Sequence, residues 1–140
     1  MTSEASRTNP RTLRVLTVAV AVVAPVTAWI LIEEVIGIEL RSPVFASTGE
    51  SVEIGLLEVT VTSLAFSLAA WGVLALLERW TKKPAKLWTM AVSIGLLASL
   101  IGPLGGTGLH LGARVALVFL HGLVAATLIA GIRPTIMPEP

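Results

Sequence analysis

Residues 115–132 read VALVFLHGLVAATLIAGI, a run of eighteen residues whose single ionisable side chain is His121. A bilayer core of about 30 Å needs roughly 20 residues of helix, with a working range of about 17–25. In lipid, each backbone N–H and C=O must find its partner within the segment, so an apolar run of this length forms a helix. The stretch therefore predicts a transmembrane helix.

Three further apolar stretches precede this one and have similar lengths. We expect four helices in all, over about residues 13–36, 53–79, 86–104 and 113–133. The loops between them are short, and the polar residues 1–10 are expected to form a disordered tail. The predicted fold is all-α, an integral membrane bundle of four antiparallel transmembrane helices that forms a single domain over residues 1–140.

The composition agrees with a membrane protein. Hydrophobic residues make up 54% of the chain and charged residues 14%, whereas a soluble domain carries about 25% charge. The absence of cysteine excludes disulfides and thiolate metal sites. Basic residues occur only in short clusters beside the helices, which gives no support for a nucleic-acid partner. We expect the lipid bilayer as the partner, with no cofactor and no metal.

The charges between the helices predict the orientation of the chain. Eight of the ten basic residues fall on one side of a four-helix arrangement, and six glutamates collect on the other. Short loops rich in Lys and Arg stay in the cytoplasm, so both termini are expected there. Arg11, Arg14 and the apolar residues after them also fit a cleaved signal peptide. However, the apolar run continues to Ile32 and contains Pro25, which favours a retained helix.

Several local signals predict where helices begin and end. Ser51, with Glu53 just after it, is expected to cap the second helix, because carboxylates favour a helix N-terminus. Gly102–Pro103 is expected to end the third helix. Trp80 and Trp88 flank the basic loop between the second and third helices, which is typical of an aromatic belt at the membrane interface.

Polar side chains at membrane depth are the candidate functional residues, because they are costly to place there. His121 lies seven residues after Arg114, so it is expected roughly 10 Å below the outer surface. Ser99 in the third helix and Ser63 in the second lie at similar depth, and Glu58 stands near the outer end of the second helix. These four residues form the candidate intramembrane polar site.

Two interpretations of this site remain open. In the structural one, His121 shares interhelical hydrogen bonds with nearby hydroxyls or with a backbone carbonyl near Pro103, and Glu58 marks the end of a helix. In the functional one, His121 takes part in proton-linked transport or ligand binding. No carboxylate lies in the middle third of any predicted span, and no serine is accompanied by an intramembrane base. We therefore predict no catalytic residue and no enzymatic activity.

The order of several segments resembles a known family. These segments are Ala70–Arg79 (AWGVLALLER), Leu87–Thr89 (LWT), Ser99–Leu104 (SLIGPL) and Ala116–His121 (ALVFLH). Together they are similar to an uncharacterised actinobacterial family of small four-helix membrane proteins, a domain of unknown function. The resemblance implies a location in the plasma membrane and the four-helix topology. It implies no activity, substrate or site residue.

The sequence thus predicts a small polytopic membrane protein of unknown activity, with a non-enzymatic structural or accessory role. Small residues at Gly95/Ser99 and Gly122/Ala126 allow close helix approach and favour a homo-oligomer or a place in a larger membrane complex. The alternative is a small transporter or channel that uses a polar layer around His121 in the outer half of the bundle.

Overall fold

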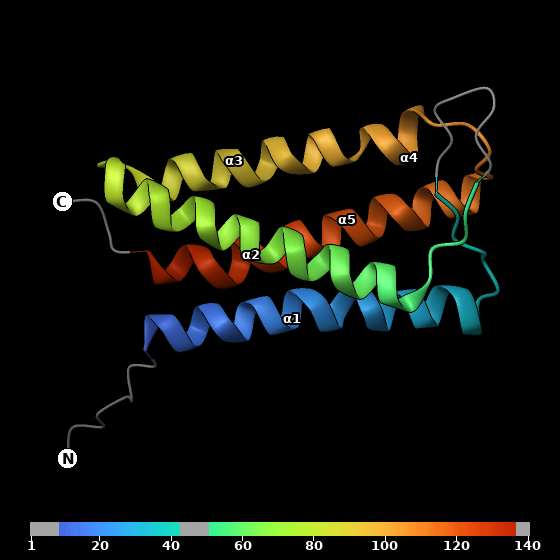
Figure 1. Ribbon diagram of the computed structural model, residues 1–140, viewed down its shortest axis with the longest axis horizontal. Helices are drawn as coiled ribbons and strands as arrows, with labels where there is room; N and C mark the ends of the chain where they lie inside the picture. The colour runs from blue at the N-terminus through green and yellow to red at the C-terminus, as the bar shows by residue number, and fades with distance from the viewer. Residues whose placement is uncertain (1–8, 43–50, 137–140) are drawn as a thin grey trace, which may run out of the picture.

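Long antiparallel helices make up the computed structural model, which describes residues 9–42 and 51–136 (Figure 1). They are α1 (Pro10–Ile30), α2 (Leu56–Trp80), α3 (Pro84–Ser99) and α5 (Leu111–Ile132). A π-helical turn, η1 (Leu31–Val35), extends α1, the short α4 (Ile101–Gly105) follows α3, and the 3-10 turn η2 (Arg133–Thr135) ends the described chain. Within these residues, four helical spans are long and apolar enough to cross a membrane, as predicted.

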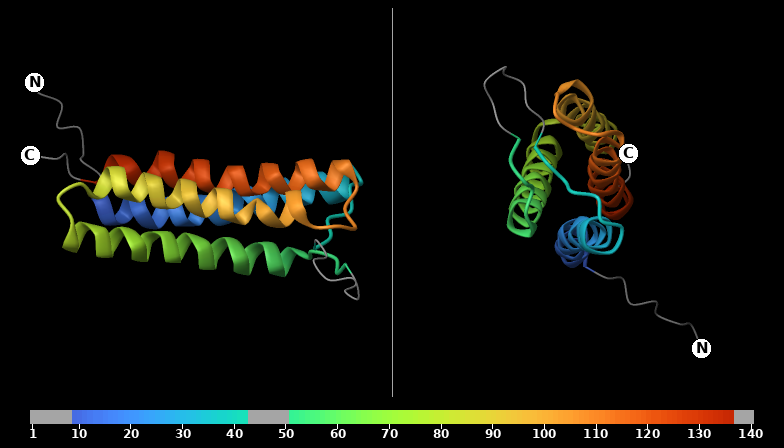
Figure 2. Two further views of the ribbon diagram at one scale, coloured as in Figure 1. Left: turned by 90° about the horizontal axis from the view of Figure 1, so that it is seen from above. Right: turned by 90° about the vertical axis from the view of Figure 1, so that its right-hand side faces the viewer.

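The helices form a ring in which each long helix contacts its two neighbours. Seen end-on, α2 lies between α1 and α3, and α5 lies between α3 and α1 (Figure 2). We call the end that holds the start of α1, the α2–α3 connection and the end of α5 the terminal end, and the opposite end the loop end. The helices α2 and α3 lie close together at the terminal end and diverge toward the loop end (Figure 1).

The start of α1 has an ordinary helix cap. The Asn9 side chain accepts a hydrogen bond from the Arg11 amide at 3.0 Å, and Pro10 occupies the first turn, where its missing N–H costs nothing. The predicted tail of residues 1–10 otherwise lies outside the described residues. The helix continues through Pro25, whose side chain is fully buried.

The predicted cap of α2 is wrong. The helix begins at Leu56, after Gly55, and the Glu58 carboxylate accepts a hydrogen bond from the Gly55 amide at 2.8 Å. The residues before it are extended, because Arg41 and Glu53 form an antiparallel bridge and the Ile54 amide donates to the Leu40 carbonyl at 2.8 Å. Backbone groups used in that bridge are not free to continue the helix toward Ser51.

The predicted end of the third helix at Gly102–Pro103 is also wrong. The chain leaves the α-helix at Leu100 and resumes it as α4, which ends at Gly105. Proline has no N–H, so Pro103 cannot donate to the carbonyl four residues earlier, that of Ser99. The break therefore appears one turn before the proline, and helix continues past it.

Candidate ligand cavity in the bundle

A cavity of about 690 Å³ lies among α2, α3 and α5, with Pro25 of α1 at its side. All four predicted site residues line it: His121, Ser99, Ser63 and Glu58. They therefore gather around one space, although they come from three helices. Gly95 lines the same space, so the Gly95/Ser99 face points into the bundle cavity.

The cavity is open sideways, between α2 and α3. Several of the residues that line it are also exposed on the surface of the described chain: Thr62, Phe66, Ala69 and Val73 from α2, and Ala91 and Gly95 from α3. A membrane-spanning bundle meets lipid on this side. Hydrocarbon chains of the bilayer thus have direct access to the cavity.

The polar groups of the cavity bond within their own helices. His121 Nδ1 lies 2.7 Å from the Leu117 carbonyl oxygen, and because a carbonyl only accepts, Nδ1 carries the proton of this hydrogen bond. The Ser99 hydroxyl donates to the Leu96 carbonyl at 2.7 Å. Both contacts are the local back-bonding that small polar residues make in helices. The expected hydrogen bond between His121 and Ser99 does not form among the described contacts.

Arg114 donates hydrogen bonds to the backbone carbonyl groups near Pro103, where a hydrogen bond from His121 was expected. Its guanidinium donates to the carbonyls of Pro103 at 3.1 Å and Leu104 at 3.0 Å, and to that of Gly106 at 2.7 Å. It also reaches the Leu109 carbonyl at 3.3 Å. A guanidinium has five N–H donors in a planar fork, so one side chain satisfies the carbonyl groups at the end of α4 and in the loop after it.

Carboxylates stand at the loop end of the cavity. Glu53 and Glu58 both line it and both are exposed. Glu58 also accepts a hydrogen bond from the Gly55 amide at the start of α2, which agrees with its expected structural role at the end of a helix. Among the described lining residues there is no Lys or Arg.

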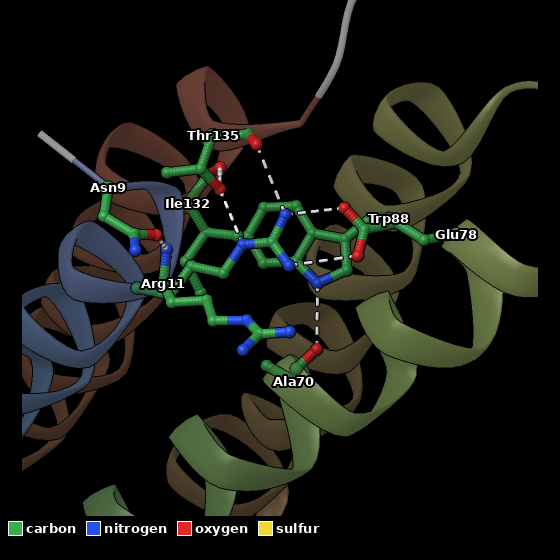
Figure 3. A network of polar contacts seen from close by, with 8 residues as sticks. Asn9, Arg11, Ala70, Glu78, Trp88, Ile132 and Thr135 are labelled. Carbon is green, nitrogen blue, oxygen red and sulfur yellow. Dashed lines mark hydrogen bonds and ion pairs between the residues drawn. The ribbon is translucent and has the colours of Figure 1, made fainter. Parts of the chain in front are cut away.

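The opposite end of the cavity is apolar and closed. Trp88 and Leu128 line it there and are 0% and 3% exposed. The Trp88 indole N–H donates to the Ala70 carbonyl at 2.9 Å, which ties α3 to α2 (Figure 3). The predicted place of Trp88 in an interfacial belt is wrong, since its ring fills the core, whereas Trp80 is exposed.

A partly exposed ion pair joins the helices at the terminal end, beyond Trp88. Arg14 of α1 makes a bidentate contact with Glu78 of α2, at 2.6 and 3.0 Å. Its Nε donates to the Thr135 hydroxyl at 2.8 Å, so three elements meet at one guanidinium (Figure 3). The side chains of Arg14 and Glu78 are 12% and 31% exposed. Sequence spacing gave no signal for this contact, which joins residues more than sixty positions apart.

His110 and Ser67 were not part of the predicted site. His110 caps α5, because its Nδ1 accepts a hydrogen bond from the Ala113 amide at 3.2 Å. Ser67 of α2 is 0% exposed, and its hydroxyl has no hydrogen-bond partner in the described structure. Ser67 is not among the residues that line the cavity. Within the described ranges, His, Asp and Glu side chains do not gather in groups of three that could hold a metal ion.

The four apolar spans define a small multi-pass membrane protein, and its cavity opens between α2 and α3. The chain belongs to a family of unknown function, DUF6069, which matches residues 5–137. This confirms the resemblance to a four-helix membrane family of unknown function. No curated protein and no solved structure matches the chain.

Proposed function

We propose that the protein is a non-enzymatic accessory protein of the plasma membrane that holds a lipid-like molecule in its bundle cavity. The cavity itself is the observation that carries this proposal. Its volume of about 690 Å³ lies within the roughly 300–1,000 Å³ of ligand pockets. Its walls are largely apolar, with a few polar groups at one end, which is how small-molecule sites are built.

The hydrogen bonds of the described polar groups in the cavity favour binding over chemistry. His121 and Ser99 both line the cavity, and each bonds to a carbonyl of its own helix. A nucleophile and its base lie within hydrogen-bond reach of one another in enzymes that use such a pair. These two side chains have other partners.

The distribution of charge supports an orientation with both termini in the cytoplasm. The basic connection between α2 and α3 lies at the terminal end, together with the start of α1. By the positive-inside rule the terminal end is cytoplasmic. The mouth of the cavity near Glu53 and Glu58 then opens at the outer leaflet.

Transport through the same cavity is the alternative function. A carrier has to open the terminal end, which Trp88 and the contact of Arg14 with Glu78 hold closed. A binding protein needs no such opening, so the closed floor favours the accessory role. Flux of a lipid-like probe across liposomes that contain the purified protein separates the two functions, since only a carrier accelerates it.

A second copy of the chain is the partner that the surface of α5 supports. Gly122 has no neighbouring atom within 4 Å of a built Cβ, and Ala126 is exposed. Small residues at this spacing allow another helix to approach closely. Cross-linking between single cysteines at Ala126 in native membranes tests this contact, and no cross-linked dimer would exclude it.

Two glycines offer a matched test of the binding function. Neither Gly95 nor Gly72 has an atom within 4 Å of a built Cβ, so a side chain can start at both positions without a clash at its first carbon. Gly95 lines the cavity, whereas Gly72 is exposed and does not. We expect Gly95→Leu to fill the cavity and to remove most of the lipid that co-purifies with the wild type. Gly72→Leu should retain it.

The readout is the molar ratio of tightly bound lipid to protein after extensive detergent exchange, measured by mass spectrometry. Equal ratios for wild type, Gly72→Leu and Gly95→Leu would contradict the proposal. Thermal unfolding of all three proteins controls for misfolding, since both leucines enter open space.

A further inference from the structure

Hydrogen-bond donors and acceptors are unequally distributed on the cavity wall. The Ser99 and Thr62 hydroxyls donate to the carbonyls of Leu96 and Glu58, so their protons are already engaged. The ring of His121 uses its Nδ1–H in the same way. Each of these groups keeps lone pairs, on the two hydroxyl oxygens and on His121 Nε2. These three groups therefore present acceptors to a ligand, whereas the hydroxyl of Ser63, which also lines the cavity, can both donate and accept.

Negative charge reinforces this preference. Glu53 and Glu58 stand at the loop end of the cavity, and the described lining residues include no basic side chain. Arg41, the nearest basic residue along the chain, stands opposite Glu53 in the antiparallel bridge and contacts Glu39 at 3.4 Å, so Glu58 is the carboxylate on which this preference chiefly rests. An anionic head group would meet carboxylates and acceptors at the cavity mouth. A cationic donor would find partners there.

The dimensions of the cavity fit a single hydrocarbon chain. Glu58 and Val73 both line it and are fifteen residues apart on α2, which corresponds to ~22 Å of helix. A volume of about 690 Å³ over that length gives a mean cross-section of ~30 Å². A helix with its side chains is about 10–12 Å across, which is wider than the enclosed part of this space.

We infer that the cavity binds a single-chain amphiphile whose head group is cationic and donates hydrogen bonds, such as a long-chain primary amine. The head group lies at the loop end, near Glu58 and Glu53, and the acceptors of Ser99 and His121 lie deeper along the cavity wall. The hydrocarbon chain runs between α2 and α3 toward Trp88. This inference rests on the proposed binding function and specifies its ligand class.

Three probes with the same dodecyl chain test the head group: dodecylamine, dodecanol and dodecanoate. Binding is measured at neutral pH as the radiolabelled probe retained by protein-containing lipid nanodiscs beyond that retained by empty ones. An alkyl amine is protonated at this pH, as lysine is. We expect the amine to bind at least ~5-fold more tightly than dodecanol, from charge pairs in a partly exposed site, and dodecanoate to bind least.

The double variant Glu53→Gln/Glu58→Gln removes the charge and keeps the hydrogen bond at the start of α2, because glutamine at the Glu58 position also accepts from the Gly55 amide. It should bind dodecylamine about as weakly as dodecanol and leave dodecanol binding unchanged. Dodecyltrimethylammonium, which carries charge without N–H donors, should bind between the amine and the alcohol.

The outcomes separate the two proposals. Equal or tighter binding of dodecanoate, abolished by Gly95→Leu, would overturn the cationic head group and keep the binding function. Binding of every probe that Gly95→Leu leaves unchanged would overturn both. If Gly72→Leu lost the preference for dodecylamine, the assignment of the binding site to the cavity would be contradicted, because Gly72 does not line the cavity.

Discussion

Gly131 marks the place where α5 comes closest to α1, and an alanine there should destabilise the bundle. A Cβ built on Gly131 would lie 2.9 Å from the Thr17 Cβ, and closer still to Thr17 Oγ1 and Cγ2. The Thr17 Cβ is attached directly to the main chain, so a change of rotamer cannot move it away. Gly131→Ala therefore forces the two helices apart.

The expected change in the free energy of unfolding of Gly131→Ala follows from two opposing effects. Overpacking a well-packed interior costs about 1–3 kcal/mol. Replacing glycine by alanine inside a helix returns up to ~1 kcal/mol of helix propensity. Gly122→Ala on the same helix is the matched control, since its Cβ meets no atom within 4 Å. Both variants share the propensity gain, so the difference between them, about 1–3 kcal/mol, isolates the clash.

The assay is equilibrium unfolding in mixed micelles, with the three proteins compared in one detergent. Thr17→Ala in the Gly131→Ala background removes Oγ1 and Cγ2 and should recover part of the loss, so the double variant is more stable than the sum of the single effects. If Gly131→Ala unfolded at the same denaturant concentration as Gly122→Ala, the close approach of α1 and α5 would be refuted.

Three further predictions concern other parts of the molecule. Arg14→Met leaves the Glu78 carboxylate without its partner and should lower the free energy of unfolding by about 1.5–3 kcal/mol. The exposed Arg79→Met is the control and should change it little in the same unfolding assay. Equal stability of the two variants would contradict this prediction. The chain has no native cysteine, so single cysteines can be labelled specifically with an impermeant reagent. A cysteine replacing Glu39 should be labelled from outside the cell and one replacing Lys83 only from inside. The reverse pattern would show that the orientation is inverted. His121→Leu loses only a hydrogen bond within its own helix, so it should change the free energy of unfolding by less than ~1 kcal/mol. The same variant should weaken dodecylamine binding. Loss of the fold would contradict the prediction that this hydrogen bond contributes little to stability.

The fold was predictable from the sequence because membrane helices are dictated by length and polarity. The stretch 115–132 has too few polar side chains to remain in water, and its backbone has to satisfy itself in lipid. Observed α5, Leu111–Ile132, contains that stretch. Depth along the membrane also follows from counting residues, which is why His121, Ser99 and Ser63 were placed at one level and line one cavity.

Rotation of each helix about its axis was not predictable in the same way. Trp88 reads as an interfacial residue because it follows a basic loop, but its side chain faces the core and bonds to Ala70. All faces of these helices are apolar, so hydrophobic periodicity carries little information about which face is buried. The contact of Arg14 with Glu78 depends on the same rotation and left no pattern in the sequence.

The polar side chains of the cavity explain why the proposed ligand is one that donates hydrogen bonds. Serine, threonine and histidine in a membrane helix lack water, and the nearest acceptors for their protons are carbonyls one turn earlier. Ser99, Thr62 and His121 all follow this rule. A cavity lined by such residues consequently offers lone pairs more readily than protons. The chemistry of the bilayer itself thus biases an intramembrane site of this composition toward ligands that donate hydrogen bonds, and Glu53 and Glu58 add the charge that distinguishes an ammonium group from an alcohol.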